Sequence, residues 1–486
     1  MTNEVKSIEK RMIKGLSVTL SSYLLTRIVN LVTTIGLARF LIPDQMGFIA
    51  VCFLLIYIID IVRDFGLRDA VIYDPKGQRG VQSTASLMLI GLGLVQAAAV
   101  FLIAPFIVTD PNSAVLREMV MWLALYFPLN SLAAIHEAVL HRALRFGRVA
   151  VAEISGVVVR ACITFALLFN DYGPMSMVYG LLAGVFCRTI VYWYQPESWR
   201  PEKPVLTLAT FSFLLGYGKH IFFTGALYAA RTRADQVLIS ALIGEAALAA
   251  YFLASRIPEI VVSGVNTSIT RVVFPGFVSS RGSKKALRSL YIRTLNGCMV
   301  GLAPLSIGLA SISTFVVPLV FGEAYSDASP VLALLALSGI PVAIGWSAGD
   351  LFKATGRPQL LTVLAVLEVF CFLPSAWAVA KITGDLVAMA ATVLVCECLV
   401  SAVRIVMVWK YYEIHPWEML RATLLPIVYA AVMGAGVLLT QSMLSNHSNF
   451  SIVAVSIIVG ISIYVALIAL FDRKTMLWVL EAAQNK

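Results

Sequence analysis

The chain has 486 residues, of which 59% are hydrophobic and 13% charged, and its formal net charge is +10. Soluble domains carry about 25% charged residues, so the composition excludes an ordinary soluble protein and indicates a membrane protein. The stretches 81–109, 294–322 and 328–349 contain no charged residue. Each is long enough to cross a bilayer core, which needs about 20 apolar residues.

The first fourteen residues are polar and basic, and they carry Val5, Ile8 and Met12 at helical spacing. This pattern predicts a short helix that lies in the membrane interface and leads into the first span. A solvated basic tail is the alternative.

Hydrophobic runs predict an all-α polytopic membrane protein with about fourteen transmembrane helices. Prolines lie in or at the ends of many of these runs, which predicts kinked or broken helices. The predicted spans are 15–41, 44–64, 81–109, 113–135, 147–170, 174–195, 209–231, 246–275, 290–315, 328–352, 358–381, 384–409, 416–440 and 451–471.

Lys and Arg are unevenly distributed among the loops. With the N-terminus inside, the cytoplasmic segments 1–14, 65–80, 136–148, 196–208, 271–293, 353–357, 410–421 and 472–486 each carry two or more. The opposite loops are poor in them, with Arg39, Arg117 and Lys381. This bias predicts that both termini are cytoplasmic. It also accounts for the positive net charge, so no nucleic-acid partner is needed to explain it.

A weak internal repeat places residues 41–49 on residues 243–251. In both places an apolar span ends at a tight turn and a second span begins. Parallel repeats of this kind place the substrate site at the interface between the two halves.

Several cations interrupt the predicted spans. A cation at bilayer depth costs at least about 2.5–3.5 kcal/mol on insertion scales, so such residues usually face a watery interior. Together they predict an anionic substrate. They are Arg27, Arg63, Arg160, Arg188, Lys219, Arg256 and Arg404.

Five short motifs occur near the ends of the predicted spans. They are Gly36-Leu37-Ala38-Arg39-Phe40-Leu41-Ile42-Pro43-Asp44-Gln45-Met46-Gly47, Asp64-Phe65-Gly66-Leu67-Arg68, Ala234-Asp235-Gln236-Val237, Phe321-Gly322-Glu323-Ala324-Tyr325 and Lys353-Ala354-Thr355-Gly356-Arg357-Pro358. These motifs resemble those of polysaccharide repeat-unit flippases. The resemblance covers most of residues 10–410 and is closest to the exopolysaccharide and colanic-acid branch of the superfamily that also holds the lipid II flippase and drug/cation antiporters.

This resemblance implies two six-helix lobes around a central cavity, at 15–208 and 209–415, with two added helices and a cytoplasmic tail at 416–486. It implies an inner-membrane protein that turns oligosaccharide units on undecaprenyl pyrophosphate from the cytoplasmic to the periplasmic leaflet. Membrane lipids, a polysaccharide polymerase and chain-length machinery are the further partners that it implies. Ala249 stands where the family usually has Gly, and Glu245 stands where the first lobe has Pro43.

Arg27 and Arg256 are the first candidates to bind the pyrophosphate, because a planar guanidinium matches its oxygens. An ion pair of Arg256 with Glu259 is the alternative. Lys219 is a further candidate.

Arg63 and Arg160 complete the candidate contacts to the substrate. The alternatives are a local salt bridge of Arg63 with Asp60, and structural pairing across helices for Glu153 and Arg160.

Asp60, Glu259 and Glu397 are the candidates for coupling to a driving ion. Glu397 and Arg404 are seven residues apart and share a helix face, so structural pairing across helices is the alternative role for them. The chain carries no Walker loop, metal-ligand cluster or nucleophile elbow, so we expect no enzymatic activity, metal or cofactor.

Two other functions compete with a flippase. A drug/cation antiporter of the same fold would favour an acidic cavity, whereas the excess charge within the predicted spans is basic. A membrane polysaccharide polymerase would need an extended extracytoplasmic loop, and no loop here is long enough.

Overall fold

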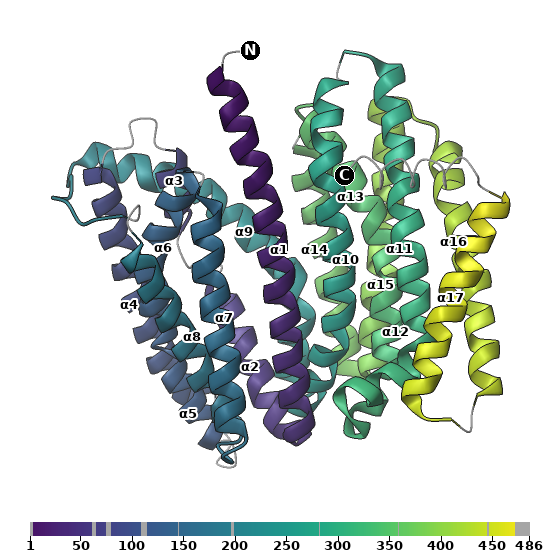
Figure 1. Cartoon of the computed structure of the whole chain (residues 1–486), viewed down its shortest axis with the longest axis horizontal. Helices are drawn as coiled ribbons and strands as arrows, with labels where there is room; N and C mark the ends of the chain where they lie inside the picture. Colours follow the sequence, from purple (N-terminus) through teal and green to yellow (C-terminus); the bar gives the residue numbers. More distant parts are fainter. Residues whose placement is uncertain are drawn as a thin grey trace. The chain divides into compact units, whose positions relative to one another are not determined.

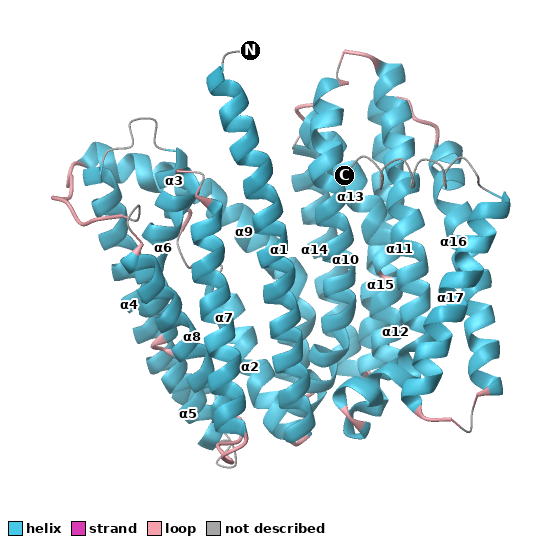
Figure 2. Cartoon of the chain, viewed as in Figure 1, coloured by secondary structure: helices cyan, strands magenta, loops and turns pink. Residues whose placement is uncertain are grey.

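The computed structural model of the chain is helical throughout the residues that it describes, with loops between the helices (Figure 2). These residues are 3–60, 65–73, 79–107, 114–143, 145–195, 199–280, 282–357, 359–444 and 447–471. The backbone alone is described for residues 3–20, 23, 69, 73, 79, 106–107, 213, 216–231, 263, 265–276, 278–279 and 471.

The chain divides into two compact units, Met1–Arg233 and Ala234–Lys486. Unit 1 is drawn from purple to teal in Figure 1. It contains α1 (Asn3–Phe40), α2 (Pro43–Asp60), α3 (Leu67–Tyr73), α4 (Arg79–Ile107), α5 (Ala114–Leu123), α6 (Tyr126–Arg142), α7 (Phe146–Leu168), α8 (Met175–Tyr194) and most of α9 (Leu208–Leu242).

Unit 2 begins inside α9 and runs from teal to yellow in the same view (Figure 1). It contains α10 (Glu245–Ser279), α11 (Lys284–Phe321), the 3₁₀-helix η2 (Glu323–Ala328), α12 (Ser329–Leu337), α13 (Gly339–Ala354), α14 (Gln359–Ile382), α15 (Leu386–Tyr412), α16 (Pro416–Met443) and α17 (Asn449–Phe471).

The predicted all-α membrane architecture is confirmed. Within the described residues, 11 helical segments are long and apolar enough to cross a membrane. The other predicted spans, 15–41, 209–231 and 246–275, lie on α1, α9 and α10. One boundary differs from expectation, since α9 continues beyond residue 231 to Leu242. The polar residues 3–14 are helical and continuous with the first predicted span in α1.

The fourth predicted span of each lobe, 113–135 and 328–352, is interrupted, and a proline lies early in the helix that follows each interruption. A proline has no N–H for the carbonyl four residues earlier, and its ring crowds that carbonyl. Pro128 and Pro341 therefore remove the helical bonds to Ala124 and Leu337. The helix breaks at these places, between α5 and α6 and between α12 and α13.

The internal repeat is visible in the packing order of the two units. In unit 1, α2 packs on α5, α4 on α6, α6 on α8, and α7 on α8. In unit 2 the corresponding pairs are α10 with α12, α11 with α13, α13 with α15, and α14 with α15. The helices α7 and α8 in unit 1, and α14 and α15 in unit 2, thus form closely packed hairpins at equivalent places in the repeat.

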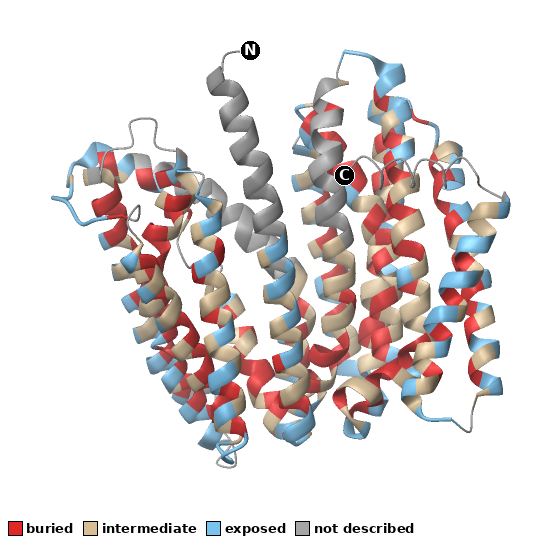
Figure 3. Ribbon diagram, viewed as in Figure 1, coloured by how far each residue is buried: buried red, intermediate tan, exposed pale blue. Residues whose placement is uncertain are grey.

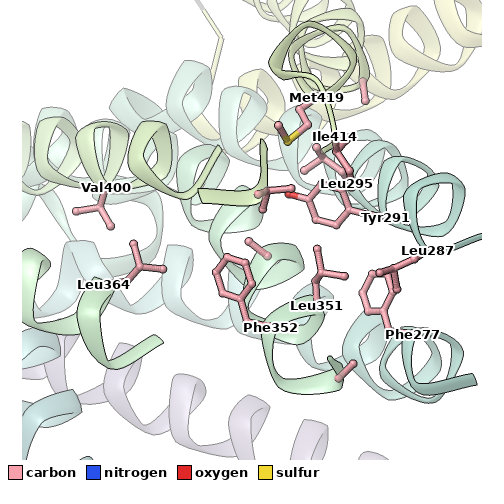
Figure 4. Packing of buried hydrophobic residues seen from close by; sticks show 14 residues of the cluster. Phe277, Leu287, Tyr291, Leu295, Leu351, Phe352, Leu364, Val400, Ile414 and Met419 are labelled. Carbon is pink, nitrogen blue, oxygen red and sulfur yellow. The ribbon is translucent and has the colours of Figure 1, made fainter. Parts of the chain in front are cut away.

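Apolar side chains fill the interior of each unit and also cover much of its surface. In unit 2, Phe277, Tyr291 and Phe352 belong to one buried cluster (Figure 4). Large apolar side chains are nevertheless exposed along α4 and α17 (Figure 3), including Leu102 at 68% and Ile458 at 64%. A water-soluble surface rarely exposes so much apolar area, whereas hydrocarbon would cover it.

Glycines allow α7 and α8 to approach closely. A Cβ on Gly184 would lie 2.6 Å from the carbonyl oxygen of Gly156 and 2.7 Å from Cβ of Arg160. A Cβ on Gly180 would lie 2.0 Å from Oγ1 of Thr164. Small residues that bring backbones together are the usual packing device between membrane helices.

We expect Gly184→Ala to destabilise the protein by about 1–3 kcal/mol, because the added methyl group overpacks the α7–α8 contact. Thermal unfolding of the purified protein measures this effect. Gly91→Ala in α4 is the matched control, since nothing lies within 4 Å of its Cβ. An unfolding temperature that is equal for the two variants would contradict the packing argument.

Candidate functional site

The α7–α8 hairpin of unit 1 holds a partly buried polar network, in which Arg188 and Glu153 are 18% and 31% exposed. Arg188 of α8 directs Nη1 to Oε1 of Glu153 on α7, at 3.4 Å. Its Nη2 donates to the side-chain oxygen of Asn130 on α6. Tyr192 donates its hydroxyl proton to the same Glu153 oxygen, at 3.1 Å. The network neutralises Arg188 and joins three helices.

Arg160 is a second guanidinium of this hairpin and lies on α7, two helical turns from Glu153. Its Cζ lies 5.3 Å from the centre of the Phe53 ring on α2. Its Nε is buried and has no hydrogen-bond partner. Among the ion pairs of the described residues, Glu153 contacts Arg188 and none involves Arg160. A guanidinium over an aromatic ring keeps its N–H edges available for an anion.

The corresponding hairpin of unit 2 also carries a buried arginine. Arg404 of α15 has Nη2 at 3.5 Å from Oε2 of Glu368 on α14, and Nη1 at 3.6 Å from Oε2 of Glu397. The three side chains are 11%, 6% and 12% exposed. A Cβ on Gly345 would lie 2.2 Å from Arg404 Nη1, so a glycine in α13 makes room for the guanidinium.

The two hairpins therefore share a Glu–Arg pair and differ in what surrounds it. In unit 1 a second guanidinium, Arg160, lies on the same hairpin as the Glu153–Arg188 pair. In unit 2 a second carboxylate, Glu397, contacts the arginine of the Glu368–Arg404 pair. A cationic interior favours an anionic ligand, and a pair of carboxylates favours a proton or metal cation.

Arg256 and Glu259 lie next to each other on α10, where their spacing places them one turn apart. Arg256 Nη1 is 3.4 Å from Oε2 of Glu259, and its Cζ is 3.8 Å from the centre of the Phe252 ring. The ion pair that the sequence offers as the alternative role of Arg256 is present.

The remaining candidates are placed one by one. Arg27 is partly buried on α1, and Asp60 is the partly buried last residue of α2. Lys219 lies on α9, with its side chain outside the description. Arg63 lies outside the described residues, and with it the predicted Asp60–Arg63 pair.

Two polar residues of the interior were missed by sequence reasoning. Asn130 is buried and contacts Arg188, but a single amide in an apolar run gives no signal of its partner. Arg233 lies beyond the predicted span 209–231 but belongs to α9, with its Cζ 4.7 Å from the centre of the Tyr57 ring. The adjacent Thr232 shares a hydrogen bond of 2.9 Å with the Tyr57 hydroxyl.

A many-span helical bundle with interrupted fourth spans and charged residues inside its helices is the architecture of a membrane transporter. A solved structure with a similar fold is the lipid II flippase MurJ in an inward closed conformation. The TM-score is 0.74 at 15% identity, over 94% of this chain and 99% of that chain.

The family follows from the sequence comparisons. Residues 36–330 match the model of the polysaccharide biosynthesis protein family, and the chain belongs to this family. The lipopolysaccharide biosynthesis protein WzxC of Escherichia coli K12 is 26% identical over 350 residues, covering 71% of this chain and 70% of that protein. The succinoglycan biosynthesis transport protein ExoT of Rhizobium meliloti is 23% identical over 469 residues, covering 94% and 92%.

The protein is therefore a multi-pass membrane transporter of polysaccharide biosynthesis, of the flippase type, and not an enzyme. Within the described residues, no group of three or more His, Cys, Asp or Glu side chains could hold a metal ion.

We expect Arg404→Met to destabilise the protein by about 3–5 kcal/mol, because it leaves the Glu368 and Glu397 carboxylates without the guanidinium that they contact. Combining it with Glu368→Gln and Glu397→Gln should recover part of the loss, since the charges are then removed together. Thermal unfolding of the two variants measures both effects. If the triple variant is no more stable than Arg404→Met, electrostatics does not hold this cluster together.

Proposed function

We propose that the protein flips oligosaccharide repeat units, linked to undecaprenyl pyrophosphate, from the cytoplasmic to the periplasmic leaflet for exopolysaccharide or lipopolysaccharide biosynthesis. Relatives named for lipopolysaccharide biosynthesis and for succinoglycan transport support a saccharide cargo. A sugar chain that is carried through the membrane by a lipid carrier presents its pyrophosphate as the main charged group.

The observation that carries this proposal is the position of Arg160. It is a guanidinium inside a helical unit, with a buried Nε and an aromatic ring beneath it. Holding such a cation in a membrane interior costs several kcal/mol, and an anionic ligand offsets that cost. A pyrophosphate offers the oxygens that a guanidinium binds in bidentate fashion.

Arg27 and Arg256 are proposed as further contacts to the pyrophosphate, together with Lys219 and Arg63. The aromatic ring and the carboxylate beside Arg256 would orient its guanidinium. Glu397, Asp60 and Glu259 are proposed as carriers of the coupling cation. Glu397 has the strongest support because two carboxylates contact one guanidinium in its cluster.

A drug/cation antiporter has weaker support, since Arg160 would repel a cationic drug in unit 1. A polysaccharide polymerase and chain-length machinery are proposed as partners that receive the exported units.

The direction of transport assumes cytoplasmic termini. Ser448 lies between α16 and α17, in a loop that is periplasmic if both termini are cytoplasmic. After replacement of the native cysteines, an impermeant thiol reagent should therefore label a cysteine introduced at Ser448 in intact cells. If this cysteine is labelled only after the cells are broken open, the termini are not cytoplasmic.

We expect Arg160→Gln to weaken substrate binding by about 2–5 kcal/mol, the usual loss when a desolvated charged contact is broken. Arg160→Lys should recover part of it, because an ammonium keeps the charge but cannot make the bidentate contact. Weaker binding should lower polysaccharide export. Export is measured in a flippase-deletion strain that carries each variant at matched levels of protein in the membrane.

Arg117→Gln is the control for these variants, since it removes an exposed arginine of α5. It should export normally. Full export by Arg160→Gln would remove Arg160 from the substrate path.

A further inference from the structure

The motif Lys353-Ala354-Thr355-Gly356-Arg357 ends α13 in a turn that fixes the direction of the following residue. Gly356 has a φ of +75°, a conformation that favours glycine. The Arg357 N–H donates to the Phe352 carbonyl at 2.9 Å, and the Gly356 N–H donates to the Lys353 carbonyl at 3.2 Å. These bonds terminate the helix and fix the backbone position from which the Arg357 side chain projects.

The guanidinium of Arg357 lies over two tyrosine rings at the end of α15. Its Cζ is 5.2 Å from the ring centre of Tyr411 and 5.8 Å from that of Tyr412. Tyr412 is itself fixed, because its hydroxyl shares a hydrogen bond with Thr355 and its ring stacks on Phe352 at 5.9 Å. Phe352 belongs to the buried cluster in Figure 4. An exposed arginine thus lies over two tyrosine rings, of which Tyr412 is fixed by its own contacts.

The surroundings of Arg357 are basic. Lys353 and Lys410 are exposed nearby along the chain. Two acidic residues at this end of unit 2 contact cations of α11: Glu413 lies 2.8 Å from Lys284, and Glu418 contacts Arg288. The Asp350 carboxylate lies 4.0 Å from Lys353. An anion arriving here would meet positive charge.

This end of unit 2 also carries the aromatic residues of a membrane interface. Trp409 and Trp417 are 50% and 65% exposed at the end of α15 and the start of α16. Exposed tryptophans at the ends of membrane helices lie at the depth of the lipid headgroups. The basic character of this end agrees with the side predicted to be cytoplasmic, where anionic lipid attracts Lys and Arg.

We propose that Arg357, on the Tyr411–Tyr412 platform, binds the phosphate group of a membrane lipid. A phosphate matches a guanidinium whose face is covered by aromatic rings, because the N–H edges remain to donate. The lipid is either a bulk anionic phospholipid or a polyprenyl pyrophosphate, and both present this chemistry at headgroup depth. Arg357 belongs to unit 2 and Arg160 to unit 1, and the transport proposal does not use Arg357.

Lipid binding to the purified full-length protein in neutral detergent tests the proposal. Native mass spectrometry counts bound phosphatidylglycerol in one arm and bound geranylgeranyl pyrophosphate in the other. We expect Arg357→Gln to weaken at least one of them about fivefold, which is the effect of about 1 kcal/mol for one basic residue at a lipid surface. Arg357→Lys should retain part of the binding.

The two arms identify the lipid. A loss confined to phosphatidylglycerol assigns the site to bulk phospholipid, and a loss confined to geranylgeranyl pyrophosphate assigns it to the carrier of the substrate. A loss of both supports a site for either lipid.

Lys381→Gln is the control, because Lys381 is an ammonium over a single ring, with its Nζ 4.9 Å from the centre of Trp377, and cannot make the bidentate phosphate contact proposed for Arg357. It should bind both lipids as the wild type does. The unfolding temperature without added lipid should be equal for the wild type and both variants, which separates binding from folding. If Arg357→Gln binds both lipids as tightly as the wild type, the site does not exist.

Discussion

A glutamate–arginine pair between neighbouring helices is the interaction that both units share. Arg188 on α8 contacts a glutamate of α7, and Arg404 on α15 contacts a glutamate of α14. Breaking such a pair leaves an uncompensated charge in a medium of low dielectric constant, which costs several kcal/mol. The close approach of α7 to α8 and the glycine at position 345 are the packing features that give these side chains room.

The repeat makes the differences between the units informative. Both hairpins carry a Glu–Arg pair, but unit 1 adds the guanidinium of Arg160 and unit 2 adds the carboxylate of Glu397. If the pair is the structural element common to the repeats, the added groups are available for function. An added cation fits an anionic substrate, and an added carboxylate fits a coupling cation. This division of roles agrees with our proposal of an ion-coupled flippase.

Much of the fold could be predicted from the sequence, because long uncharged runs have few alternatives to membrane helices. Prolines in the spans predicted kinked or broken helices, and breaks occur next to Pro128 and Pro341. By contrast, α4, α14 and α16 continue through Pro105, Pro374 and Pro426. The end of α9 was predicted too early, since the charged residues around Arg233 resemble a loop when each is considered alone. In the structure the helix continues through this region, where Arg233 lies over the Tyr57 ring and Thr232 shares a hydrogen bond with the Tyr57 hydroxyl.

The candidate site was less predictable than the fold. Spacing along one helix predicted the contact of Arg256 with Glu259, three residues away. It could not predict the contact of Arg188 with Glu153, because the two residues lie on different helices, 35 residues apart in the sequence. Sequence periodicity places residues on a face, and the packing of neighbouring helices decides which charges meet.

The central claim is that this chain itself moves a pyrophosphate-linked oligosaccharide across a bilayer. Vesicles containing the purified protein and a fluorescent oligosaccharide on undecaprenyl pyrophosphate test it directly, with an impermeant quencher reporting which leaflet holds the sugar. We expect sugar to equilibrate between the leaflets in vesicles with the wild-type protein, and at least tenfold more slowly with Arg160→Gln, as a loss of about 2 kcal/mol or more implies. Sugar that stays in its original leaflet with the wild type, or that moves equally fast with Arg160→Gln, would contradict the account.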